Sequence, residues 1–145
     1  MTHAATIQVP LTHRIVVCGS PKSGKSTYAL QLLHTQVGGT FLYHLDSLIA
    51  SHAWSDQSEV ALKYLTEASP CIVEGCAAVR ALRKYLDRHV GRPCDTVVRM
   101  ATPRVELSRG QETLRKGEVT IWREIESELQ RRGVAIELRP GTQVT

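Results

Sequence analysis

Long hydrophobic runs are missing from this sequence of 145 residues, and none approaches the roughly 20 residues of a membrane-spanning helix. Residues 1–13 lack the basic start and the long apolar centre of a signal peptide. We therefore expect a cytoplasmic protein with no membrane partner. Internal repeats and low-complexity tracts are also absent. The length suits one domain over residues 1–145, with loose ends at 1–12 and 140–145.

Cysteine is scarce, with four residues that form no CxxC pair and no zinc-binding spacing. Cys18 and Cys71 lie in apolar, strand-like runs, which predicts buried and unreactive thiols. The six histidines are scattered, and we expect His44 to face away from Asp46. The sequence thus predicts no metal site built from cysteine or histidine.

The charge is unbalanced, with a formal net charge of +4 and a pI of about 9.0. This balance favours an anionic partner. The phosphates of a nucleotide would satisfy it as well as DNA or RNA would, so charge alone does not choose between them.

Apolar patterns along the chain alternate between strand and helix. We predict strands at residues 14–18, 41–45, 71–74, 95–100 and 134–138, and helices at 25–36, 57–68, 77–89 and 118–132. A polar, arginine-rich stretch at 103–116 is expected to be helical and mobile. Such alternation indicates an α/β protein with a parallel sheet covered by helices on both faces. Ligands of these proteins bind at the carboxyl ends of the strands.

The most specific motif, G-x-x-x-x-G-K-S, occupies residues 19–26 between the first predicted strand and the first predicted helix. The backbone N–H groups of such a loop, with the helix that follows it, bind phosphate. We expect Lys25 to contact the terminal phosphates of a nucleotide and Ser26 to bind Mg²⁺. The expected nucleotide-binding residues are Gly19, Ser20, Pro21, Lys22, Ser23, Gly24, Lys25, Ser26 and Thr27.

Two acids follow the next predicted strands, Asp46 after the second and Glu74 at the end of the third. Phosphoryl transfer uses one carboxylate to orient or deprotonate the accepting hydroxyl and another near the metal. We assign Asp46 as the base, in contact with substrate, and Glu74 to the metal, directly or through water. Asp46 could instead cap a short helix. Trp54 could stack on an acceptor ring or cover the core.

Residues 19–27, 45–48 and 72–75 together resemble the small P-loop kinases, and the order of motifs agrees over residues 14–139. That group includes nucleotide kinases, shikimate and gluconate kinases, chloramphenicol phosphotransferase and the kinase domain of polynucleotide kinases. The resemblance implies a P-loop NTPase fold, a three-layer α/β/α sandwich with a five-stranded parallel sheet and a short arginine-rich lid. It also implies ATP and Mg²⁺ as cofactors and Asp46 as the activating aspartate. The metal-side aspartate of these families is Glu74 here.

Arginines of the lid neutralise charge on the transferring phosphoryl group in such kinases, and Arg109 and Arg115 are our candidates. A second basic set shares one face of the helix predicted at 77–89, namely Arg80, Arg83, Lys84 and Arg88. Arg80 is expected near the acceptor. The rest could follow a nucleic-acid backbone or be a solvated helix face.

These features predict an ATP-dependent kinase that phosphorylates a hydroxyl group. The acceptor could be a nucleotide, a hydroxymethylated base or an end in DNA or RNA, or a small metabolite. The alternative is a regulatory P-loop ATPase module without kinase activity. ATP is favoured over GTP because the guanine-specific pattern Asn-Lys-x-Asp is absent.

Overall fold

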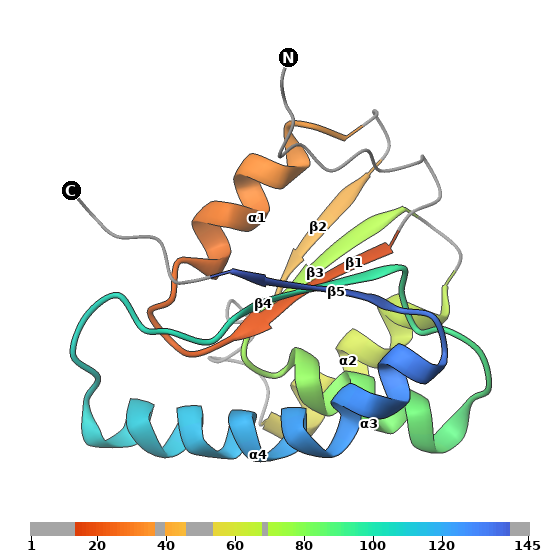
Figure 1. Ribbon diagram of the computed structural model, residues 1–145. Coiled ribbons are helices and arrows are strands. Elements are labelled where there is room, and N and C mark those ends of the chain that lie inside the picture. Colours follow the sequence, from red (N-terminus) through yellow and green to blue (C-terminus); the bar gives the residue numbers. More distant parts are fainter. Residues whose placement is uncertain (1–13, 37–39, 46–53, 68–69, 140–145) are drawn as a thin grey trace.

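The computed structural model describes residues 14–36, 40–45, 54–67 and 70–139. Strands and helices alternate along these residues (Figure 1). The elements are β1 (Arg14–Gly19), α1 (Lys25–Leu33), β2 (Phe41–His44), α2 (Trp54–Thr66), β3 (Cys71–Glu74), α3 (Ala78–Arg88), β4 (Thr96–Met100), α4 (Arg109–Arg131) and β5 (Ala135–Arg139). The strand predictions are confirmed to within one residue at each end. No helix in the described part of the chain is both long and apolar enough to cross a membrane.

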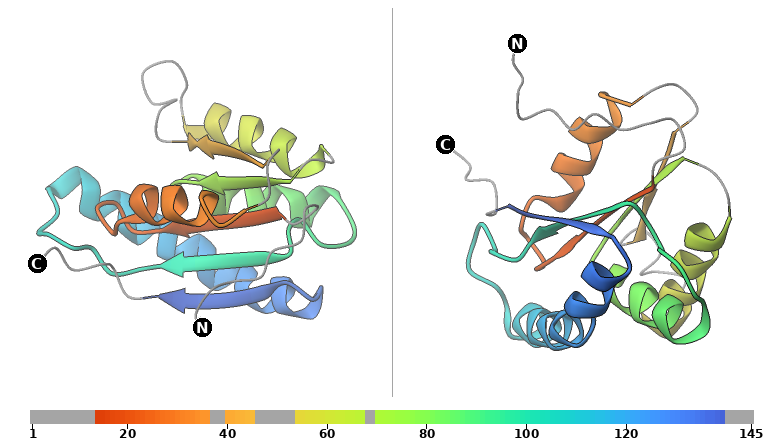
Figure 2. Two further views of the ribbon diagram at one scale, coloured as in Figure 1. Left: turned by 90° about the horizontal axis from the view of Figure 1, so that it is seen from above. Right: turned by 45° about the vertical axis from the view of Figure 1, so that its right-hand side comes forward.

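The five strands form one sheet in the order β2-β3-β1-β4-β5, and every neighbouring pair is parallel (Figure 2). Strand β1 lies at the centre, and the chain crosses over it between β3 and β4. The chain thus runs to one side of β1 first and to the other side afterwards. The carboxyl end of the sheet beside β1 and β3 is where this topology positions a ligand.

Helix α1 covers one face of the sheet, whereas α2, α3 and α4 cover the other (Figures 1 and 2). The side chains of β1 pack alternately against the two helical layers, because successive side chains of a strand point to opposite faces of the sheet. Ile15 and Val17 pack in the cluster that contains Ala29 of α1, while Val16 and Cys18 pack with residues of α2, α3 and α4. The predicted three-layer sandwich is confirmed.

Helix α4 is longer than predicted, because it joins the helix expected at 118–132 to much of the arginine-rich stretch expected at 103–116. A capping box starts it. The Ser108 hydroxyl accepts a hydrogen bond of 3.2 Å from the Gln111 N–H, and the Gln111 side chain accepts one of 2.9 Å from the Ser108 N–H. This motif satisfies the free amides of a helix start. The connection between β4 and α4 is therefore short, at residues 101–108.

All four cysteines are buried and none forms a disulfide, and burial was predicted for Cys18 and Cys71. Burial raises the pKa of Cys18 to about 12 and the pKa of Cys71 to about 11. Burial also raises the pKa of Cys94. A thiol with a raised pKa is a poor nucleophile, so these three side chains act as small apolar groups of the core.

Candidate active site

The phosphate loop leaves β1 at a position that only glycine can occupy. Gly19 has a φ of 145°, and a Cβ placed there would lie 1.9 Å from the carbonyl oxygen of Met100. The next residue, Ser20, donates its N–H to that same oxygen at 3.0 Å. Gly24, with a φ of 92°, turns the chain into α1. Strand β4 and the two glycines therefore fix the loop at both of its ends.

Lys25 lies over the loop rather than in solvent. Its side chain is buried, and Nζ donates a hydrogen bond of 2.6 Å to the carbonyl oxygen of Ser20. Lys22 is exposed and has a φ of 60°, and its carbonyl oxygen accepts a hydrogen bond of 2.7 Å from the Arg104 N–H. The connection 101–108 is thus attached to the loop through backbone atoms. The Lys25 contact holds an ammonium group over the loop, as phosphate binding requires.

A buried carboxylate lies beside the start of α1. Glu74 ends β3 with an exposed fraction of 0%, and its Oε1 accepts a hydrogen bond of 3.1 Å from the Ser26 hydroxyl. The same Oε1 lies 2.6 Å from Nδ1 of His44, at the end of β2. The strand register explains this contact, since His44 and Glu74 are direct partners in the parallel ladder. Side chains from α1, β2 and β3 therefore meet at one carboxylate oxygen.

The prediction that His44 faces away from Asp46 is not tested, because Asp46 lies outside the described residues. The contact of His44 with Glu74 was not predicted from the sequence. It follows from the β2–β3 register, which pairs these two residues. Among the described residues, no cluster of three or more histidine, cysteine or acidic side chains forms a metal site on its own.

The donor set around Glu74 fits a magnesium ion that also binds nucleotide phosphates. Mg²⁺ prefers oxygen ligands and binds through one or two carboxylate or hydroxyl groups, with waters and phosphates completing its shell. Glu74 Oε2 is buried without a hydrogen-bond partner in the described part of the chain, and so is the Ser23 hydroxyl of the loop. Polar atoms that are buried without a partner are costly. A metal-bound water would donate to Glu74 Oε2, and a phosphate oxygen would accept from the Ser23 hydroxyl.

Asp46 lies outside the described residues, so its assignment as base remains a prediction. Trp54 begins α2, and its side chain also lies outside the described part. Arg109 and Arg115 both fall in the first two turns of α4. Arg115 contacts Glu112 on the same helix, whereas Arg109 is exposed. Their proposed role at the phosphoryl group stays a prediction.

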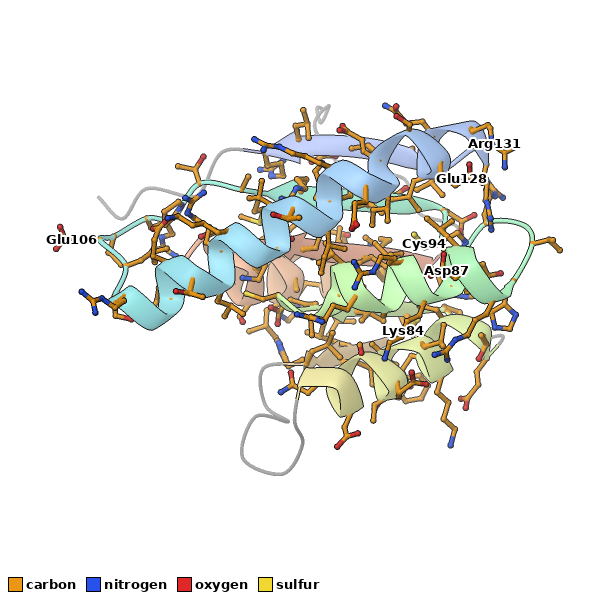
Figure 3. The ribbon with its side chains drawn as sticks, turned by 90° about the horizontal axis from the view of Figure 1, so that it is seen from below. Lys84, Asp87, Cys94, Glu106, Glu128 and Arg131 are labelled. Carbon is orange, nitrogen blue, oxygen red and sulfur yellow. The ribbon has the colours of Figure 1, made fainter. Side chains whose placement is uncertain are left out.

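The basic face of α3 is largely paired with acids of the neighbouring helices. Lys84 and Arg88 both contact Glu59 of α2, at 2.7 Å and 3.1 Å, and Arg83 contacts Glu124 of α4 at 2.9 Å. Lys84 lies between α3 and α2 in Figure 3. These pairs lower the pKa of Glu59 to about 2, chiefly through the hydrogen bonds from Arg88 and Lys84. The face is therefore not an open run of positive charge.

A cavity of about 250 Å³ opens between the start of α3 and the middle of α4. Its wall on the sheet side begins at Cys76, two residues beyond Glu74. The residues that line it are Cys76, Val79, Arg80, Thr113, Leu114, Gly117, Glu118 and Ile121. The cavity therefore lies near the carboxyl end of β3, two residues along the chain from Glu74.

Beneath this cavity lies an ion pair that the sequence did not reveal. Arg99 of β4 and Glu118 of α4 are both buried, and Nη2 of Arg99 donates to Oε1 of Glu118 at 2.7 Å. The second guanidinium nitrogen contacts Oε2 of Glu118, and the guanidinium stacks 4.8 Å from the centre of the Trp122 ring. The only signal of this ion pair in the sequence was an arginine in an apolar strand pattern. Glu118, 19 residues further along, could not be named as the partner of Arg99 without the fold.

The sequence matches no protein-family model and no curated protein. Among solved structures, shikimate kinase from Acinetobacter baumannii in complex with shikimate is similar over 91% of this chain and 85% of that chain, with a TM-score of 0.53 and 15% identity. Shikimate kinase from Bacteroides thetaiotaomicron is similar over 86% of this chain and 85% of that chain, with a TM-score of 0.45 and 11% identity.

Together the fold and the loop define the P-loop NTPase fold. The likeness to the Acinetobacter enzyme shows the five-stranded parallel sheet and helical layers of that fold. At 15% identity it establishes the architecture, while activity has to be argued from the site.

Proposed function

We propose that this chain is an ATP-dependent kinase that transfers the γ-phosphoryl group of ATP to a hydroxyl group of a small acceptor. The observation that carries the proposal is the Ser26–Glu74–His44 contact beside the phosphate loop. A loop that only bound phosphate would not need a fully buried carboxylate with one unpartnered oxygen at this point. A metal-dependent phosphoryl transfer does need it.

In this reaction the loop amides and Lys25 bind the β- and γ-phosphates, and Ser26 and Glu74 would hold Mg²⁺, Glu74 directly or through water. When bound, the metal ion would supply positive charge to the phosphates. Asp46 orients the accepting hydroxyl and takes its proton as the oxygen–phosphorus bond forms. The bond to the β-phosphate oxygen breaks, and ADP leaves. Lys25 stabilises the charge that develops on the phosphoryl oxygens.

The contacts of α3 favour a small acceptor over a nucleic acid. Three of the four cations on its basic face are paired with Glu59 or Glu124, so they are not free to follow a phosphate backbone. The fold likeness to a kinase whose structure contains shikimate is consistent with a small alcohol. A hydroxymethylated base or an end in DNA or RNA is the competing acceptor.

Acceptor-dependent release of ADP tests the proposal. The purified chain is incubated with MgATP and with mixtures of small alcohols, nucleosides or oligonucleotides, and ADP release is compared with and without each mixture. A kinase releases ADP faster with its acceptor, and the label of γ-labelled ATP appears on that acceptor. A regulatory ATPase would release ADP at one slow rate with every mixture and label none of them.

A further inference from the structure

We propose that the cavity between α3 and α4 binds the acceptor of the proposed kinase, and that it takes a compact alcohol carrying one anionic group. Arg80 binds the anion, and Gly117 sets the size of the acceptor. That the bound molecule is the phosphoryl acceptor rests on the proposed function. The anion selectivity and the role of Gly117 follow from the cavity itself.

The charge of the cavity is the first argument. Arg80 is half-buried on its wall, and its guanidinium has no ion-pair partner among the described residues. Glu118 also lines the cavity, but both of its oxygens are held by Arg99. The two arginines and one glutamate leave a net charge of about +1 within the reach of a bound molecule. A carboxylate or a phosphate monoester would neutralise it.

A glycine inside a long helix is the second argument. Glycine costs stability in a helix interior relative to alanine. Gly117 nevertheless lies in the middle of α4 on the cavity wall, and a Cβ at this position would meet no atom within 4 Å. Gly117 is exposed, and it leaves open space on the cavity wall that a larger side chain would fill.

Size is the third argument. Pockets that enclose drug-sized ligands measure roughly 300–1,000 Å³. The cavity, at about 250 Å³, is smaller. Its remaining wall mixes apolar side chains, such as Ile121, with the hydroxyl of Thr113. This combination suits an acceptor of about one ring with a hydroxyl and an anionic substituent, not a polymer.

Cys76 allows a test of the cavity that does not need the natural acceptor. Cys76 is buried like Cys18, Cys71 and Cys94, but it lines the cavity, so a reagent small enough to enter the cavity should reach it before the other three. The full chain is treated with two methanethiosulfonates of similar size, one ending in a sulfonate and one in a trimethylammonium group. Peptide mass spectrometry then gives the rate of labelling at Cys76.

We expect the sulfonate reagent to label Cys76 about tenfold faster than the trimethylammonium reagent, because Arg80 attracts the anion. Arg80→Gln should remove this preference. Gly117→Leu should slow both reagents, whereas Gly110→Leu, also on α4 with open space around its Cβ and outside the cavity, should slow neither. Equal rates with the two reagents, or labelling that ignores Gly117→Leu, would overturn the proposal.

The acceptor assignment is tested by transfer to matched pairs. The pairs are glycerate with glycerol, gluconate with glucose, and a nucleoside monophosphate with its nucleoside, so that carboxylate and phosphate are distinguished. We expect label only on anionic members, and an acceptor kcat/KM at least about tenfold lower in Arg80→Gln and Gly117→Leu with an unchanged KM for ATP. Transfer to neutral members or to a hydroxymethylated oligonucleotide would overturn it. Failure of the proposed function gives a different result. The chain would then not bind MgATP, while the labelling of Cys76 would still be charge-selective.

Discussion

Removing Arg99 should destabilise the protein far more than removing an arginine of the surface. Arg99→Met would leave the Glu118 carboxylate buried without its partner, since both side chains are at most 4% exposed. Breaking a buried ion pair by removing one partner costs about 3–5 kcal/mol. The lost stacking on Trp122 adds to this cost. For a chain of this size, such a loss lowers the melting temperature by on the order of 10 °C.

The double variant Arg99→Met/Glu118→Leu should recover most of that stability, because two apolar groups can replace a buried pair at little cost. Arg83 and Glu124 provide the matched control, since they link α3 to α4 with exposed fractions of 38% and 49%. Arg83→Met should cost no more than about 1 kcal/mol. Urea unfolding followed by circular dichroism measures all four proteins. The reasoning fails if Arg99→Met is no less stable than Arg83→Met.

Three further predictions concern the site and the surface. Asp46→Asn should slow phosphoryl transfer by roughly 10²–10⁴ with ATP binding intact, whereas normal transfer with a lower melting temperature would identify Asp46 as a helix cap. His44→Phe should raise the Mg²⁺ concentration for half-maximal nucleotide binding by about tenfold or more, as measured by calorimetry. His44→Gln should restore part of the affinity, and unchanged Mg²⁺ dependence in both variants would remove His44 from the site. Glu59→Gln should destabilise the protein at neutral pH, and the loss should vanish as the pH falls, in contrast to Glu67→Gln.

The sign of the Glu59 effect follows from its lowered pKa. The ion pairs with Arg88 and Lys84 hold the pKa at about 2 in the folded chain, against an ordinary value of 4.5. The stability they contribute is complete above the ordinary value and is lost between about 4.5 and about 2 as the carboxylate is protonated. Urea unfolding over this pH range checks the prediction. A difference between Glu59→Gln and the parent that persists at the acid end would contradict it.

Local signals predicted most of the fold. The strand, glycine loop and helix over residues 14–33 form one continuous motif, and short runs with apolar residues marked the other strands. The start of α4 inside the arginine-rich stretch was harder to predict. Ser108 and Gln111 cap this helix, and its first turns carry no apolar stripe. Propensity at a polar helix start is weak, and the capping box decided the boundary.

Contacts between distant segments could not be predicted from the sequence. Helical spacing correctly placed Arg83, Lys84 and Arg88 on one face of α3, but the acids that pair with them lie on α2 and α4. The same holds for Arg99 with Glu118, and for His44 with Glu74. Each pair depends on strand register or on helix packing. The sequence therefore indicated the phosphate loop and the acid at the end of β3, but not what surrounds them.

The central claim is phosphoryl transfer that depends on the phosphate loop, and one measurement tests it most directly. Transfer from γ-labelled ATP to the acceptors described above is compared for the parent chain, Lys25→Ala and the control Lys63→Ala, whose lysine is exposed on α2. Circular dichroism confirms that each is folded. The account predicts labelled acceptor with the parent and with Lys63→Ala, and a loss of at least about 10²-fold with Lys25→Ala. Near-normal transfer by a folded Lys25→Ala protein would contradict it.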